Sequence, residues 1–301
     1  MHHAWLLTGS KGLGKREFAR AAAASLVAAP AGRTPAIDTH PDVIILENAP
    51  KDEKEARKKA DGEPYETKRN ISVDQIREMQ HRLTVRPTLG ERRAIIIDPA
   101  DHLEKSAVNA LLKSLEEPPS RTVFFLISHQ SGRLLPTIRS RCRMLRFDQL
   151  EAAEIDAVLR RDMPGADASL RVLAIEAARG SPGIALSFVA HKLNLLHQLM
   201  KRILREGDPD FTLRTAMAEE IGARPARERM AAALDLARME MATALYTSTR
   251  RQQARIIEAH AAMTRLSIQA PTYNFDPGLL AMEIGGLLAS TAMPRETANR
   301  A

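Results

Sequence analysis

A glycine-rich loop near the start of the chain has the residue types and spacing that bind phosphate. It follows an apolar run, opens a helical pattern and reads G-x-x-x-x-G-K, with candidate phosphate-binding residues Gly9, Gly12, Gly14 and Lys15. In such a strand–loop–helix unit, backbone N–H groups hold the phosphate oxygens and the lysine neutralises their charge. The next residue is normally a Ser or Thr that binds Mg²⁺, but here it is Arg16, which cannot bind a metal. Two interpretations follow: a loop kept only as inherited architecture, or a loop that still binds nucleotide.

A second chemical position lies where the apolar run 94–97 ends at Asp98. Carboxylates that organise a bound metal sit at the carboxyl ends of parallel strands, so Asp98 resembles the Walker B aspartate of an ATPase. ATPases of this type place a glutamate next, to polarise the attacking water, whereas this chain has Pro99, and neither Ala100 nor Asp101 stands in the same position. Asp98 could equally cap the turn that follows. The loss of the base predicts a site without hydrolysis.

A basic loop follows the last predicted strand of this part of the chain. Its residues are Arg139, Ser140, Arg141, Cys142 and Arg143. A charge run of this kind is usually a solvated surface with no further role. At this position, however, an arginine could reach a phosphate held by a neighbouring subunit and stabilise charge in its transition state.

The apolar runs around these residues predict a parallel sheet. They are continuous rather than alternating, which is typical of strands covered on both faces, and helical patterns separate them. The predicted strands are 3–8, 42–47, 94–97 and 123–127. Predicted helices cover 15–28 and the segment from Ser72 to about Val85, where Ser72 and Gln75 fit a capping box. Residues 50–70 are nearly all polar, which predicts a solvated and partly disordered insertion.

Beyond Phe147 the sequence predicts only helices. Short helices are expected at 150–161, 168–179 and 184–190, and long helices at 193–205, 224–250 and 252–268. The change from strands to short and then long helices predicts three domains: an α/β domain over 1–149, a small helical domain over 150–190 and a larger helical domain over 191–301.

Amino-acid composition limits which cellular compartment and which classes of partner the protein is expected to have. The net charge of +7 suits nucleic acid or an acidic protein, although a proteome rich in arginine would give the same value. The single cysteine, Cys142, excludes an internal disulfide and a zinc site of several cysteines, and it favours a reducing cytoplasm. No stretch approaches the roughly 20 apolar residues of a membrane span.

The motif LLKSLEEPP at 111–119, followed by Ser140-Arg141-Cys142, resembles the clamp-loader subunits of bacterial DNA polymerase III. The resemblance covers the α/β domain and continues into Gly180–Gly183. It implies an AAA+ domain, a helical lid and an all-helical collar that holds a hetero-oligomeric ring. It also implies that Arg141 is an arginine finger that acts in trans on the ATP of the adjacent subunit.

Departures from the family pattern point to one branch of the family. Gly183 stands where the lid normally carries a sensor arginine, and it departs together with Arg16 and Pro99. This combination resembles the delta-prime branch, and the opening HAWLLTG resembles its alphaproteobacterial members. The family often carries a four-cysteine zinc module after the first helix; this chain has no cysteine there, so we expect no zinc, with 50–70 occupying that region. Family members also carry an upstream segment at the adenine pocket; its absence is expected to weaken nucleotide binding, unless the true start lies upstream.

The resemblance implies a non-hydrolysing stator that works in DNA replication within a DNA polymerase holoenzyme. Its expected partners are tau/gamma motor subunits and a delta subunit in a heteropentameric ring, with the sliding clamp and primed DNA reached through the complex and no membrane. No cofactor is expected beyond weak ATP or ADP. One alternative is an ATP-hydrolysing motor subunit, favoured by Lys15 and the intact glycines. Another is a basic nucleic-acid-binding module acting alone, which the scarcity of aromatic residues, 4%, opposes.

Overall fold

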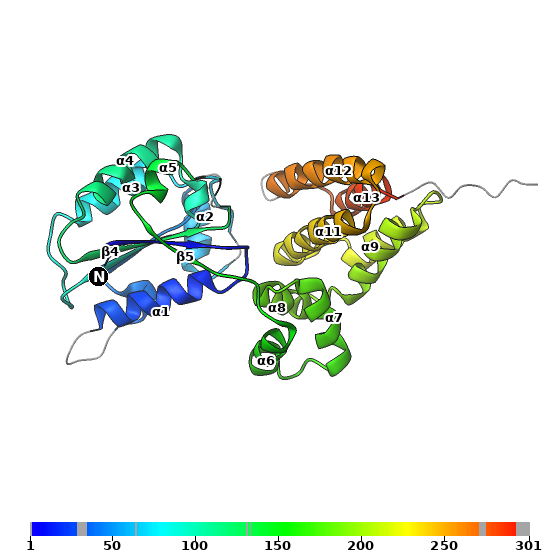
Figure 1. Ribbon diagram of the computed structural model, residues 1–301, viewed down its shortest axis with the longest axis horizontal. Coiled ribbons are helices and arrows are strands. Elements are labelled where there is room, and N and C mark those ends of the chain that lie inside the picture. The colour runs from blue at the N-terminus through cyan, green and yellow to red at the C-terminus, as the bar shows by residue number, and fades with distance from the viewer. Residues whose placement is uncertain are drawn as a thin grey trace, which may run out of the picture. The chain divides into compact units, whose positions relative to one another are not determined.

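The computed structural model describes residues 2–28, 35–63, 65–130, 132, 134–270 and 275–292. The chain divides into two compact units, Met1–Gln149 and Leu150–Ala301. The first unit combines a sheet with helices, and the second is helical (Figure 1). The candidate site residues other than Gly183 all lie in the first unit.

The first unit is built on a five-stranded parallel sheet in the order β2-β3-β4-β1-β5. Its strands are β1 (Ala4–Thr8), β2 (Val43–Leu46), β3 (Arg93–Ile97), β4 (Thr122–Ser128) and β5 (Arg143–Arg146). The parallel sheet predicted from the continuous apolar runs is confirmed, and with the helices it gives an α/β domain. The sequence patterns missed β5, because this short edge strand is mostly exposed and has only two apolar residues between two arginines.

Helices cover both faces of this sheet, which explains why the strands are apolar throughout. On one face α1 (Lys15–Val27) packs Ala19 and Ala23 against Leu7 and Ile96. On the other face α3 (Val73–Arg82) and α4 (Lys105–Glu116) pack against the sheet, as Figure 1 shows. Neighbouring residues of each strand therefore enter different cores. The predicted capping box of α3 is present, although the helix ends at Arg82 rather than near Val85.

The polar segment 50–70 is more ordered than its composition suggests. It contains α2 (Glu53–Ala60), where the Asp52 carboxylate accepts from the Glu55 backbone N–H. The Glu55 carboxylate is buried and accepts from the Glu66 N–H and Lys58 Nζ, each at 2.6 Å. The expectation of partial disorder is therefore wrong for residues 50–63 and 65–70. The segment also follows β2 rather than α1, so it does not occupy the position directly after the first helix.

Three short elements complete the first unit. They are the 3₁₀ helices Ile37–Thr39 and Ala100–His102 and the helix α5 (Pro136–Arg139), which precedes the Arg141 loop. In the described part of the chain, no helix is both long and apolar enough to span a membrane.

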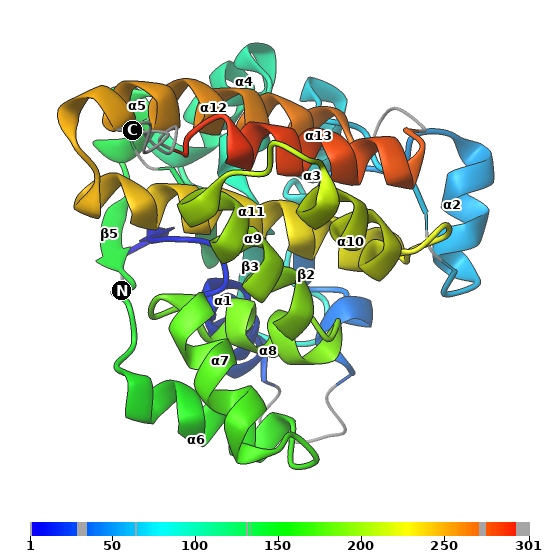
Figure 2. The ribbon, with the colours of Figure 1, turned by 90° about the vertical axis from the view of Figure 1, so that its right-hand side faces the viewer.

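The second unit is helical in all its described elements. Its helices are α6 (Ala152–Asp162), α7 (Ala168–Ala178), α8 (Pro182–Ala190), α9 (Asn194–Glu206), α10 (Thr212–Ile221), α11 (Arg227–Thr247), α12 (Arg250–Gln269) and α13 (Pro277–Ala289). Figure 2 shows α12 and α13 side by side. One hydrophobic cluster includes residues from α6 through α13, so the division of this unit at residue 190 stays a prediction.

Candidate functional site

The glycine loop joins β1 to α1 and has the backbone conformation that its glycines permit. Gly9 and Gly14 have φ angles of +142° and +78°, a region that side chains with a Cβ rarely adopt. At Gly9 a Cβ would also come within 2.4 Å of the Phe147 carbonyl oxygen. Gly14 is the N-cap of α1, so the loop opens onto the N-terminus of this helix. This is the backbone arrangement that suits an anion.

Lys15 is buried, and its amine closes the loop on itself. Its Nζ donates to the carbonyl oxygens of Gly9 at 2.8 Å and Ser10 at 2.5 Å. Burial lowers the pKa of Lys15, while the nearby charges of Asp98 and Asp101 act in the opposite direction. A phosphate would therefore have to compete with two backbone carbonyls for this ammonium.

Arg16 forms an ion pair with Asp98, the carboxylate that would bind a metal in a Walker B strand. Its Nε donates to Oδ2 of Asp98, whose side chain is only 6% exposed, and its outer nitrogen lies 3.7 Å from Oε2 of Glu47. The Asp98 carboxylate is thus paired with a guanidinium. The alternative role of Asp98 as a turn cap is not supported, since the following 3₁₀ helix has Pro99 as its N-cap and no side-chain cap bond.

The residues around Pro99 do not replace the missing base. Asp101 is committed to the end of β4, where its carboxylate accepts from Ser128 Oγ at 2.7 Å and from the His129 N–H at 2.6 Å. His102 bonds Asn48 through Nδ1 at 3.0 Å.

His129 was not anticipated from the sequence. Burial lowers its pKa first, and the charge of Lys15 lowers it further, so the imidazole is a neutral neighbour of the phosphate loop. The signal that could have identified it is its place directly after a buried strand.

Arg141 lies between α5 and β5, and its guanidinium has three bonding partners in its own chain. Nη1 donates to the Thr137 carbonyl oxygen at 2.9 Å and to Ser140 Oγ at 3.4 Å, while Nη2 lies 2.5 Å from Glu116 Oε1. The side chains of Arg141 and Glu116 are 33% and 49% exposed. The structure therefore brings together the LLKSLEEPP motif and the Ser-Arg-Cys loop. The contact with Glu116 was missed, although both motifs were visible in the sequence.

The residues beside Arg141 have different surroundings. The Arg139 side chain is exposed and has no hydrogen bond or ion pair within the described segments, whereas the Arg143 guanidinium lies 5.4 Å from the centre of the Trp5 ring. Cys142 packs against the core, and burial raises the pKa of its thiol to about 11. The loop thus has a buried support on one side and exposed arginines on the other.

The remaining site predictions concern Gly183 and metals. Gly183 is the second residue of α8, after the N-cap Ser181, and it offers no side chain. Among the residues that the structure describes, no three His, Cys, Asp or Glu side chains are grouped as metal ligands. The expectation that this protein needs no zinc stays a prediction.

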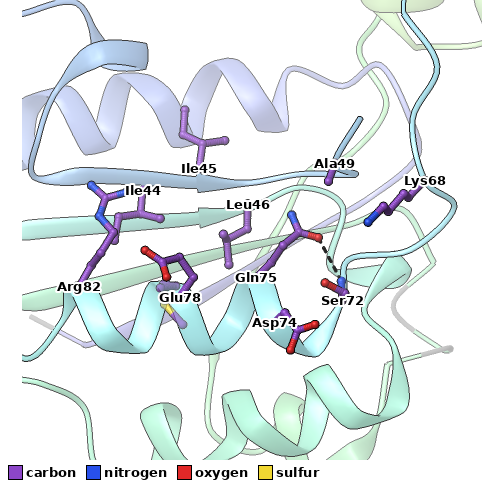
Figure 3. Close-up of a pocket in the computed structure, with 11 residues that line it drawn as sticks. Ile44, Ile45, Leu46, Ala49, Lys68, Ser72, Asp74, Gln75, Glu78 and Arg82 are labelled. Carbon is purple, nitrogen blue, oxygen red and sulfur yellow. Dashed lines mark hydrogen bonds between the residues drawn. The ribbon is translucent and has the colours of Figure 1, made fainter. Parts of the chain in front are cut away.

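A groove of about 390 Å³ lies away from this chemistry, between edge strand β2 and helix α3 (Figure 3). Ile44 and Leu46 of β2 line it, together with Gln75, Glu78 and Arg82 of α3. It contains none of the phosphate-loop or arginine-loop residues, and its mixed charges and apolar strand edge do not suggest one ligand.

The sequence comparisons match subunits of DNA polymerase III. The family model described as "DNA polymerase III, delta subunit" matches residues 1–151. The chain is 41% identical over 151 residues to DNA polymerase III subunit delta' of Pseudomonas aeruginosa, and 38% identical over 125 residues to that of Escherichia coli. These matches cover 46% and 41% of this chain, and 41% and 37% of the two relatives. They therefore span less than half the length of the relatives.

Other matches are more distant. DNA polymerase III subunit gamma/tau of Mycobacterium tuberculosis is 32% identical over 192 residues, which is 62% of this chain and 32% of that relative. Among solved structures, a gamma subunit-related protein of Thermotoga maritima matches with a TM-score of 0.48 at 20% identity, covering 96% of this chain and 94% of that chain.

Proposed function

The chain belongs to the DNA polymerase III delta subunit family, and from that premise we propose that it is the delta-prime stator of a clamp loader. In this role it supports ATP-dependent loading of the sliding clamp onto primed DNA but does not hydrolyse ATP itself. The helices over 150–190 would form the lid, and those over 191–301 would form part of the collar. Its partners would be tau/gamma motor subunits and a delta subunit in a heteropentameric ring.

The observation that carries this proposal is the ion pair between Arg16 and Asp98. Hydrolysis in this class of ATPase needs a metal held near the Walker B carboxylate and a base that activates water. Here the carboxylate is bound to a guanidinium, and Pro99 stands where the base would be. The family match covers the same part of the chain, so the loss of both groups supports a subunit without turnover.

The proposed contribution of this chain to chemistry is Arg141. Its side chain is one-third exposed, on a loop whose Cys142 packs against the core, so the loop can present a cation without losing its support. In the assembled ring, Arg141 would stabilise the transition-state charge on the ATP of the adjacent motor subunit.

We further propose that the phosphate loop binds ATP or ADP weakly at most and that no zinc is required. The backbone of the loop suits an anion, but Lys15 is already bound to the carbonyls of Gly9 and Ser10. The alternative, an ATP-hydrolysing motor subunit, rests on that same glycine loop and lysine.

Phosphate release by the purified chain separates stator from motor. We expect no ATP hydrolysis above background, with or without primed DNA, and no difference between the wild type and Lys15→Ala. Steady turnover that disappears in Lys15→Ala would reject the stator and establish the motor.

Co-purification from cell extract, with identification of the bound proteins, tests the partners independently: tau/gamma and delta subunits are expected, and recovery of the chain without them would reject the assembly.

A further inference from the structure

We infer that Glu116 is a positioning residue that holds Arg141 in the orientation from which it reaches the neighbouring subunit's ATP. This inference rests on the proposed function, and it adds a second residue to the proposed finger. Nη2 of Arg141 lies 2.5 Å from Glu116 Oε1, and α4 and α5 are in contact around this pair. The two residues are 25 positions apart in sequence, so the pair depends on the fold.

The three contacts leave part of the guanidinium free. Nη1 has two partners, Thr137 O and Ser140 Oγ, and Nη2 has Glu116. An arginine carries five N–H groups, so the Nε–H and one N–H of Nη2 have no partner in the described part of the chain. Those two donors remain for phosphate oxygens while the other groups stay bound.

Glu116 is attached to a rigid support. It is the last residue of α4, whose Leu111 and Leu115 are buried in the core beneath the sheet-covering helices. The C-terminal end of a helix is itself negative, so helix and carboxylate attract the guanidinium from the same side. Thr137 and Ser140 lie within four residues of Arg141, in α5 and at its C-cap, so of the three contacts only the one with Glu116 links the guanidinium to a distant part of the domain.

Stability does not account for this contact, since an ion pair this exposed contributes little to folding. Its effect is on the freedom of the arginine. A long side chain loses rotamer entropy when it is fixed on a ligand, and a contact that fixes it beforehand removes that loss from the reaction. Catalysis by the neighbour would therefore gain in kcat rather than in KM for ATP.

The neighbouring residue Glu117 provides a matched control. It has the same charge, is exposed, and its side chain has no hydrogen bond or ion pair within the described residues. A change at Glu117 alters the local charge as much as a change at Glu116 does, but it leaves Arg141 with all its partners.

The test uses the reconstituted complex of this chain with its motor and delta subunits, with ATP hydrolysis measured in the presence of clamp and primed DNA. We expect Glu116→Ala to lower kcat by at least half as much as Arg141→Ala lowers it. The KM for ATP should stay within about twofold of the wild-type value. Glu116→Gln should recover part of the loss, because it keeps an oxygen beside Arg141 Nη2 but lacks the negative charge. Glu117→Ala should match the wild type, and the double variant Glu116→Ala/Arg141→Ala should equal Arg141→Ala alone.

Each other outcome overturns a defined statement. If Arg141→Ala has no effect, the proposed finger fails and this inference fails with it. If Arg141→Ala lowers kcat but Glu116→Ala behaves like Glu117→Ala, adds to Arg141→Ala in the double variant, or raises hydrolysis, then the finger stands and the positioning role is wrong. Thermal unfolding of each variant chain is the control for folding; should Glu116→Ala unfold, Glu116→Gln carries the same comparison.

Discussion

The two arginine centres of the first unit use the same side chain in opposite ways. Arg16, whose side chain is 48% exposed, pairs with a carboxylate that is only 6% exposed, while Arg141, 33% exposed, pairs with a carboxylate that is 49% exposed. A charge pair around a buried carboxylate is poorly screened and costly to break from one side, whereas an exposed pair exchanges readily with other ions. The pair around the buried Asp98 carboxylate therefore closes a site within this chain, and Arg141, paired with an exposed carboxylate, remains exchangeable for use by another.

The largest expected effect comes from removing the Arg141 side chain. Arg141→Ala should leave the chain folded and assembled, because truncating an exposed loop side chain usually costs little stability. Hydrolysis by the reconstituted complex should fall; arginine fingers contribute on the order of 10³–10⁵ in rate in simple GTPases, and less is expected here because other motor sites receive arginines from their own neighbours.

Arg139→Ala and Arg143→Ala are the controls, assayed for clamp-dependent hydrolysis and clamp loading at the same salt concentration. The Arg139 side chain has no partner in the described residues and Arg143 lies over Trp5, so both should matter less than Arg141. Equal, modest losses in all three variants would mean a general basic patch, and the finger role would be withdrawn.

The next largest effect comes from removing the Arg16 side chain. Arg16→Ala leaves the Asp98 carboxylate nearly buried without its cation, which should lower the free energy of unfolding by about 1–3 kcal/mol. Millimolar Mg²⁺ should restore part of that loss in the variant and have no effect on the wild type, and nucleotide affinity of the variant should become Mg²⁺-dependent. Thermal unfolding and titration calorimetry measure both. Strong Mg²⁺ enhancement of nucleotide binding in the wild type would contradict the closed site.

Asp42 sharpens this comparison, because its buried carboxylate accepts hydrogen bonds from backbone N–H groups, while its arginine partner, Arg93, lies 3.9 Å away. Burial alone would raise its pKa, but the N–H groups of Thr88, Leu89 and Gly90 outweigh burial and hold the pKa of Asp42 below its usual value. A depressed folded-state pKa stabilises the protein above the unfolded pKa of about 3.9, and that stabilisation is lost as the pH falls through the lower folded value.

Asp42→Asn should therefore lower the free energy of unfolding at neutral pH by about 1–3 kcal/mol, and the difference from the wild type should shrink below about pH 4. Chemical denaturation from pH 3 to 7 measures it. A difference that stayed constant over that range would show that packing, and not the charge, is lost.

The smallest effect concerns the buried side of the Arg141 loop. A thiol with a pKa of about 11 is protonated at neutral pH, so Cys142 should react slowly with iodoacetamide in the native chain and quickly after unfolding. Mass spectrometry of timed samples gives both rates. Rapid native alkylation would mean that Cys142 does not support the Arg141 loop from its buried side. The contrast between Arg141 and Arg16 would then lose one of its grounds.

The local features were predictable from the sequence because each depends on residues that lie close together along the chain. Continuous apolar runs predicted four of the strands, Ser72 and Gln75 predicted a helix start, and the identities of Arg16 and Pro99 alone removed a metal ligand and a base. Composition misled where a few contacts outweigh it: α2 forms in a polar segment because Asp52 caps the helix and the Glu55 carboxylate binds the returning chain at Glu66.

Only the tertiary structure decided which charges meet. Arg16 and Asp98 are 82 residues apart, and they pair because β1 and β3 run parallel and end at the same edge of the sheet. Arg141 and Glu116 pair because α4 ends beside the loop after α5. Residue types determine which bonds a side chain is able to make, but the strand order and the helix ends determine its partner. The sequence alone therefore established that the site had lost its metal hydroxyl and base, while the fold established that Arg16 is bound to Asp98 and that Arg141 stays at the surface.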